Sequence, residues 1–242
     1  MAHGTPDWGL VGPKRTVFGL DDVGEAAVRL GSPHLWDRRG DSIIIDNFGE
    51  GLGMTRPETH GLGASVDLRG GHAFHGAFCA QLTAGSTGIR QANLRYYHGL
   101  PLAGPIGLEF SFTLHADVST LSWEMHWHLG TEILQCEVAY NHVASTLEWE
   151  GPGSVMHVFV AGVNIDVGDR LWNTGKLVGD FETRQYVRFL LNGNVYDLSG
   201  NALNVVAGGT NPHLGVFVEN YATPGNNPVV LVDRVILTQN EP

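Results

Sequence analysis

Strict alternation of apolar and polar side chains in residues 106–115 constrains the fold of this chain more than any other feature of its sequence. The apolar positions are Ile106, Leu108, Phe110, Phe112 and Leu114. Successive side chains of a β-strand point to opposite faces, so a period of two indicates a strand with one face in a core. The sequence therefore predicts a sheet whose two faces differ in polarity.

Two following stretches repeat this alternation. The apolar side chains are Trp123, Met125, Trp127 and Leu129 in the first stretch, and Leu134, Cys136, Val138 and Tyr140 in the second. Together the three stretches predict an antiparallel meander with one face in the core. The opposite face of that meander is predicted to carry His115, Glu124, His126, His128, Gln135 and Glu137.

Shorter strand-like runs account for much of the remaining chain. They span residues 42–48, 74–82, 155–160, 186–191, 195–198, 214–219 and 229–237. The run 155–160 is apolar on both faces, which is typical of a central strand. The sequence Asn192-Gly193-Asn194 predicts a hairpin turn. The 33 glycines and 11 prolines suit many short strands joined by tight turns, so the composition favours an all-β protein.

Composition also limits the class of partner. Of the 242 residues, 43% are apolar, which is enough for one large domain with a hydrophobic core. The formal net charge of −11 and the absence of a basic stripe argue against nucleic acid as a partner. No apolar run approaches the roughly 20 residues of a membrane helix. Cys79 and Cys136 lie in apolar runs, so we expect both to be small buried side chains.

The first 40 residues differ from the remainder. Residues 1–20 contain recurrent Gly and Pro without a helical period, which predicts an extended arm. Residues 21–31 start with acidic capping candidates and end at a glycine, which predicts one short helix. The first residues have neither the basic nor the apolar segment of a secretory signal. We therefore expect a protein made in the cytoplasm and not secreted by a signal peptide.

Three motifs in the second part of the chain resemble the concanavalin A-like jelly-roll sandwiches, which include laminin G modules, legume-type lectins and laminarinase-type hydrolases. These motifs are Ile-Asp-Asn-Phe-Gly-Glu-Gly at 45–51, the Asn-Gly hairpin that ends in Tyr-Asp-Leu-Ser at 196–199, and Val-Val-Leu-Val-Asp-Arg-Val-Ile-Leu at 229–237. The resemblance covers about residues 42–240. It implies an antiparallel jelly-roll β-sandwich over 41–242, preceded by the N-terminal extended arm and short helix of residues 1–40. Because this superfamily hosts unrelated functions, the fold alone does not decide the activity.

The front segment resembles uncharacterised structural proteins of bacteriophages. The resemblance lies in Pro6-Asp7-Trp8-Gly9, the short helix, and Asp37 to Asp41 leading into a jelly roll. It implies a non-enzymatic virion component, such as a capsid decoration or tail-associated protein, that forms a homo-oligomer and contacts a capsid or tail protein. In that interpretation Trp8 anchors the arm to its partner, and Arg38 and Arg39 supply ion pairs.

Two other functions use the sandwich itself. A carbohydrate-binding module needs exposed aromatic platforms beside polar groups, and Trp149, Trp172, Tyr96, Tyr97 and Tyr221 are the candidates. A glycan-cleaving enzyme needs two carboxylates. Laminarinase-type hydrolases carry both on one strand as Glu-x-Asp-x-Glu, whereas this chain has Glu124, His126 and His128 at those positions. Glu137 on the next strand is the candidate for the second carboxylate.

The same strand offers ligands for a metal ion. His126 and His128, two residues apart, point to one face beside Glu124, which suits a transition metal if His115 or Glu137 adds a further ligand. A polar outer face explains the same residues without a metal. We therefore predict no enzymatic activity, no cofactor and no metal, with Glu124, His126, His128, Trp149 and Trp172 as ligand-binding candidates and glycan as an alternative partner.

Overall fold

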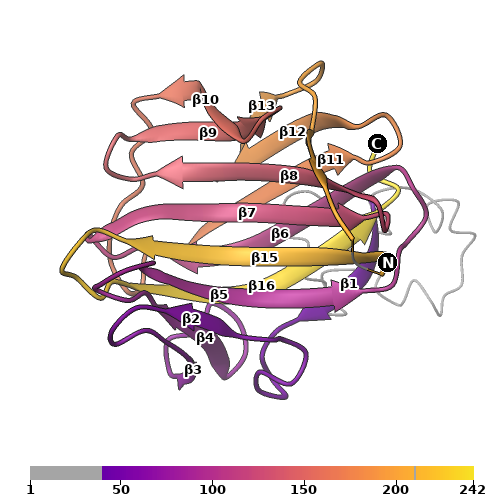
Figure 1. Cartoon of the computed structure of the whole chain (residues 1–242). Helices are drawn as coiled ribbons and strands as arrows, with labels where there is room; N and C mark the ends of the chain where they lie inside the picture. Colours follow the sequence, from indigo (N-terminus) through magenta and orange to yellow (C-terminus); the bar gives the residue numbers. More distant parts are fainter. Residues whose placement is uncertain (1–39, 210) are drawn as a thin grey trace, which may run out of the picture. The chain divides into compact units, whose positions relative to one another are not determined.

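The computed structural model describes residues 40–209 and 211–242, and this part of the chain forms sixteen β-strands in two antiparallel sheets (Figure 1). The strands are β1 (Asp41–Asp46), β2 (Glu58–His60), β3 (Ser65–Gly70), β4 (Phe78–Thr83), β5 (Gln91–His98), β6 (Pro105–Thr113), β7 (Val118–His128), β8 (Glu132–Asn141), β9 (Thr146–Gly151), β10 (Val155–Ala161), β11 (Asn173–Asp180), β12 (Gln185–Leu191), β13 (Asn194–Asp197), β14 (Asn204–Ala207), β15 (His213–Ala222) and β16 (Val229–Gln239).

The two sheets have different strand orders. Sheet A runs β13-β12-β11-β6-β16-β4-β3, with β1 beside β16. Sheet B runs β10-β9-β8-β7-β15-β5-β2, with β14 beside β8. Strands distant in the chain are neighbours in both sheets, because the chain crosses repeatedly from one sheet to the other. The all-β jelly-roll sandwich predicted from the sequence is confirmed.

The core lies between the inward faces of the sheets and includes the apolar positions of the alternating stretches. Trp123 of β7 is fully buried and stacks on Phe110 of β6, with ring centroids 4.7 Å apart. Its indole Nε1 donates a hydrogen bond of 3.2 Å to the carbonyl oxygen of Gly175 on β11. A Cβ at position 175 would lie 2.4 Å from the Trp123 ring, so only glycine allows the two sheets to approach this closely here.

The predicted three-stranded meander is wrong in one respect. Strands β7 and β8 pair as expected, but β6 belongs to the opposite sheet. His115 lies in the turn after β6, beside Asp117, and therefore does not join the polar face of β7 and β8. Alternation shows that a strand has one buried face, but it does not show which of two facing sheets the strand joins.

The run at 155–160 is an edge strand and not the predicted central one. Strand β10 pairs only with β9, and Val155 and Val158 are 51% and 57% exposed. Apolar side chains on both faces suit a central strand, but here the outer ones remain in contact with solvent. Phe74 was also placed in a strand by its sequence, whereas β4 begins four residues later, at Phe78.

The arm and short helix predicted for residues 1–40 fall almost entirely on residues 1–39, outside the described part of the chain. The domain boundary predicted near residue 40 stays a prediction. Within 40–209 and 211–242 no helix is long and apolar enough to cross a membrane.

Candidate functional site

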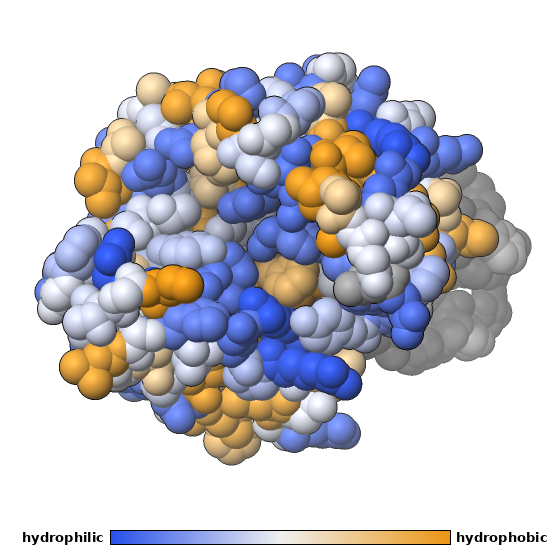
Figure 2. Space-filling model, in the orientation of Figure 1, coloured by the Kyte–Doolittle hydropathy of each residue, from blue (hydrophilic) through white to orange (hydrophobic). Residues whose placement is uncertain are grey.

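The strand register brings a group of polar side chains together on the outward face of sheet B. Directly paired residues of an antiparallel sheet point to the same face. Glu124 on β7 is opposite Glu137 on β8 and Phe217 on β15, and Phe217 is opposite Arg95 on β5. In the next row Glu219 on β15 is opposite Asn93. Figure 2 shows a mostly hydrophilic surface that is hollowed near its centre.

Phe217 provides an aromatic floor on this face. Its ring is 7% exposed and contacts the His126 ring, with centroids 4.8 Å apart, and the Tyr97 ring at 6.3 Å. A Cβ at Gly215 would lie 3.0 Å from two ring atoms of Phe217, so this glycine gives the ring the space to lie over the sheet. An aromatic ring surrounded by polar side chains is typical of sites that bind ligands with both apolar and polar groups.

Carboxyl groups flank the aromatic floor on neighbouring strands. Glu124 and Glu137 occupy directly opposed positions, where Cβ atoms lie about 4.5–5.5 Å apart. Burial raises the pKa of Glu137 well above its ordinary value, and the nearby Glu124, Glu150 and Glu219 raise it further. Burial likewise raises the pKa of Glu150. The folded chain therefore favours the protonated form of Glu137, which can donate a hydrogen bond or a proton.

Glu219 is the third carboxyl group of this cluster. Burial, assisted by the charge of Glu124, raises its pKa to about 7. The hydroxyl of Tyr221 donates a hydrogen bond of 2.7 Å to Glu219, and Gln91 donates one of 2.7 Å to that hydroxyl. These bonds fix the carboxyl group in place. Glu219 is thus held near the midpoint of its titration at physiological pH.

The histidines of β7 form the next part of the face. His126 contacts the Glu124 carboxylate through Nε2 and lies 3.2 Å from the side-chain nitrogen of Gln135. His128 stacks on His213 of β15, with centroids 4.0 Å apart. Burial, assisted by the neighbouring His213 and His126, lowers the pKa of His128 to about 4. His128 is therefore neutral at physiological pH.

Arg95 brings a positive charge beside the aromatic floor. Its guanidinium lies 5.3 Å from the centroid of the Phe217 ring and is ion-paired with Glu58 on β2. Next to it, Asn93 is fully buried, and its amide has no hydrogen-bond partner within the described residues. Because leaving a buried amide unpaired costs about 1–3 kcal/mol, packing alone does not account for an asparagine at this position.

The structure brings together three of the five ligand-binding candidates predicted from sequence. Glu124, His126 and His128 share the outward face of sheet B. Trp149 is not on this face, because it lies on the core side of β9 and stacks on His157 at 4.7 Å. Trp172 lies before β11 against Phe74, with centroids 5.7 Å apart. The arm residues Trp8, Arg38 and Arg39 fall outside the described residues, and their binding role stays a prediction.

Sequence reasoning missed several residues of this face. Phe217 lies in an apolar run whose alternation does not distinguish inward from outward positions. Strand β5 was not predicted, so Arg95 and Asn93 were not considered, and Tyr96 was taken for a loop residue although it is buried in the core. The pattern of Ala92, Leu94 and Tyr96 at alternate positions was the available signal.

The histidines and glutamates do not form a metal site. Within residues 40–209 and 211–242, no group of three or more His, Cys, Asp or Glu side chains is placed to hold a metal ion. His126 is engaged with Glu124, and His128 with His213.

Similarity to solved structures supports the fold. The cellulose-induced protein Cip1 superposes with a TM-score of 0.57 at 14% identity, covering 81% of this chain and 97% of that one. An endo-β-1,4-glucuronan lyase from the fungus Trichoderma reesei gives 0.56 at 11% identity, covering 82% and 95%. A carbohydrate esterase from the Shiga toxin-encoding bacteriophage phi24B gives 0.53 at 12% identity, covering 82% and 98%.

These likenesses agree with the concanavalin A-like jelly-roll architecture expected from the sequence. At such low identity they establish the fold and leave the activity open. No protein-family model and no curated protein matches the sequence.

Proposed function

We propose that the protein binds a saccharide chain on the outward face of sheet B. The observation that carries the proposal is the Phe217 ring, which lies over Gly215 and is surrounded by hydrogen-bonding side chains. Sugar rings have apolar C–H faces and polar rims, so an aromatic floor with carboxyl, imidazole and guanidinium groups around it suits them. Two of the similar structures are named for acting on carbohydrates, which makes glycans the first ligands to test.

Binding to a panel of oligosaccharides, measured by titration calorimetry, tests this proposal. Phe217→Ala should weaken binding by at least about tenfold, because the central aromatic contact is removed. Val195→Ala is the matched control, since Val195 is 60% exposed on β13 of sheet A. Equal affinity of the Phe217→Ala protein and the unchanged protein would contradict the proposal.

A second variant separates loss of binding from loss of folding. Gly215→Ala retains every aromatic ring but forces the Phe217 ring to move, since the new Cβ would lie 3.0 Å from it. It should weaken binding while leaving the circular dichroism spectrum of the sandwich unchanged. If the spectrum of either variant changes, the loss of binding by that variant is due to unfolding and not to the missing contact.

A second candidate function is cleavage of the bound saccharide. The observation that favours it is the directly opposed pair of Glu124 and Glu137, in which burial raises the pKa of Glu137 well above its ordinary value. Two carboxyl groups with different protonation states are the arrangement that acid–base catalysis of glycan cleavage requires. In this candidate Glu137 is the proton donor and Glu124, which His126 contacts, is the second carboxyl group.

Glu137→Gln tests the catalytic candidate. The amide preserves the shape of the side chain but cannot transfer the proton, so turnover of any cleaved oligosaccharide should fall by about 100-fold or more while binding is retained. Glu148→Gln on β9 is the matched control, because Glu148 belongs to the same face but lies farther from Phe217 in the strand register. If the unchanged protein cleaves none of the saccharides that it binds, the catalytic candidate is wrong and saccharide binding is the remaining function.

A further inference from the structure

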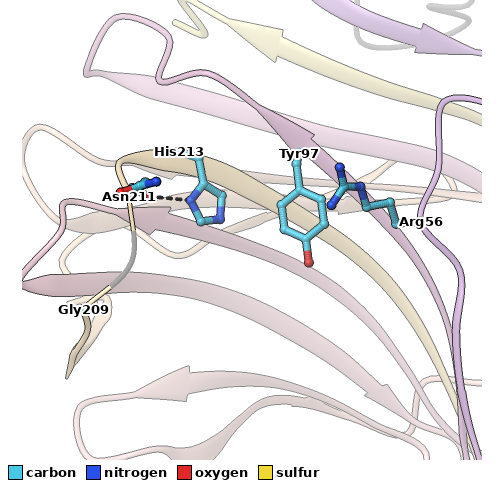
Figure 3. Close-up of a pocket in the computed structure, with 5 residues that line it drawn as sticks. All are labelled: Arg56, Tyr97, Gly209, Asn211 and His213. Atoms are coloured by element: carbon cyan, nitrogen blue, oxygen red, sulfur yellow. Dashed lines mark hydrogen bonds between the residues drawn. The ribbon is translucent and has the colours of Figure 1, made fainter.

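One end of the outward face of sheet B opens into a pocket of about 650 Å³. Its lining comes from three separate parts of the chain: Arg56 before β2, Tyr97 on β5, and Gly209, Asn211 and His213 at the start of β15. In Figure 3 Tyr97 lies between Arg56 and His213. The register continues the face into this pocket, because Tyr97 is opposite Gly215, the residue beneath the Phe217 ring.

Arg56 differs from the other arginine of this face. Arg95 is ion-paired with Glu58, whereas Arg56 has no carboxylate partner within the described residues. The Arg56 guanidinium lies 5.5 Å from the centroid of the Tyr97 ring, and its backbone nitrogen donates a hydrogen bond of 2.8 Å to the carbonyl of Arg95. The cation is therefore held beside the pocket with its hydrogen-bond donors available for a ligand.

Tyr97 and His213 add further polar groups. The Tyr97 ring is 44% exposed and lies 5.5 Å from the His213 ring, measured between centroids. His213 Nδ1 lies 2.7 Å from the carbonyl oxygen of Asn211. A carbonyl oxygen can only accept a hydrogen bond, so Nδ1 carries a proton, and Nε2 is the ring nitrogen that can meet a ligand.

Charge is distributed unevenly along the face. The carboxyl groups of Glu124 and Glu219 lie at its centre, so an anionic group of a ligand is disfavoured there. Arg56 provides the opposite potential at the end near Tyr97. A ligand that carries both neutral and anionic units is therefore bound in one orientation, since reversing it would place the anion among the carboxyl groups.

We propose that this pocket binds a carboxylate or sulfate group on a sugar unit of the saccharide, with a neutral part of the chain over Phe217. The inference rests on the proposed function, and it defines the ligand as an acidic saccharide of fixed orientation. Arg56 forms the charge-assisted hydrogen bonds, which a carboxylate or sulfate accepts in the fork geometry of a guanidinium.

Matched oligosaccharides of equal length test this inference: one neutral, one with a terminal uronic acid and one with a terminal sulfate ester. Arg56→Gln should weaken binding of the acidic ligands by about tenfold or more and of the neutral ligand by less than about twofold. Arg170→Gln, at an exposed arginine in the loop before β11, is the matched control and should change none of the affinities. The ligand that loses more affinity identifies carboxylate or sulfate as the preferred group.

Free glucuronate and inorganic sulfate provide a test that does not require an oligosaccharide to bind. Either anion should shift the imidazole NMR signals of His213 in the full chain, and Arg56→Gln should abolish the shift. If this shift occurs although no oligosaccharide binds, the pocket is an anion site and the proposed function is wrong. If neutral and acidic oligosaccharides bind equally and Arg56→Gln affects neither, the anion site is refuted and saccharide binding stands.

Discussion

The outward faces of the two sheets are both polar, but they differ in how charge is balanced. On sheet A, Lys176 lies 2.7 Å from Glu241, and Arg188 lies 2.5 Å from the same carboxylate. On sheet B, carboxyl groups gather with few cations, and the pKa values of Glu137, Glu150 and Glu219 are raised. Ion pairs within the chain balance the buried Glu241 carboxylate beside sheet A, whereas burial raises the pKa values of the sheet B carboxyl groups, which is typical of sites that act on ligands.

The largest change in stability should follow from removing one charged group on the outward face of sheet A. Lys176→Met leaves the Glu241 carboxylate and the nearby Glu109 buried with less compensation, since Lys176 is 2% exposed. We expect the free energy of unfolding to fall by about 3–5 kcal/mol, measured by urea denaturation.

The corresponding change on sheet B should not destabilise the protein. Glu137→Gln removes a carboxyl group whose pKa burial raises well above its ordinary value, so the free energy of unfolding at neutral pH should change by less than about 1 kcal/mol. Equal losses from Lys176→Met and Glu137→Gln would show that the two faces are balanced in the same way.

The dependence of stability on pH provides a smaller effect. The folded-state pKa of Glu219 is about 7, above the value in the unfolded chain, so the folded state binds the proton more tightly. Stability should therefore fall by about 2–3 kcal/mol as pH rises from about 4.5 to about 7, and then level off. Unfolding measured across this range should lose most of that slope in Glu219→Gln. The exposed pair Glu132–Arg184 provides the control Glu132→Gln, which should preserve it.

His128 should produce a change in stability of similar size, with the opposite sign. Its folded-state pKa of about 4 lies below that of the unfolded chain, so the unfolded chain takes up the proton first as pH falls. Stability should drop by about 2–3 kcal/mol between about pH 6.5 and about pH 4. In His128→Gln this loss should disappear from the unfolding curves. An unchanged loss would assign it to another group.

Alternation in the sequence predicted much of this architecture and half of the candidate site. In β7 every second residue from Trp123 to Trp127 is buried, so the outward positions of Glu124 and His126 followed directly. The pairing of β7 with β15 joins residues some ninety positions apart, as in Glu124 and Phe217, and no local pattern reports such a contact.

The mixed polarity of some strands explains why the sequence did not predict β5 and the exposure of β10. Strand β5 contains Gln91, Asn93 and Arg95 on one face and Ala92, Leu94 and Tyr96 on the other, so Leu94 is the one strongly apolar residue among these alternating positions. Strand β10 is the opposite case, because its sequence is strongly apolar and yet most of its side chains are exposed. Tertiary pairing decides both cases, since burial depends on which strand lies alongside.

The contact between Trp123 and Gly175 also restricts how this sequence can change over evolutionary time. Any side chain at 175 would overlap the indole ring, with a Cβ 2.4 Å from it. Replacement of the glycine is therefore expected only in descendants that have already exchanged the tryptophan for a smaller residue. Positions 123 and 175 should vary together among homologues, although 52 residues separate them in the chain.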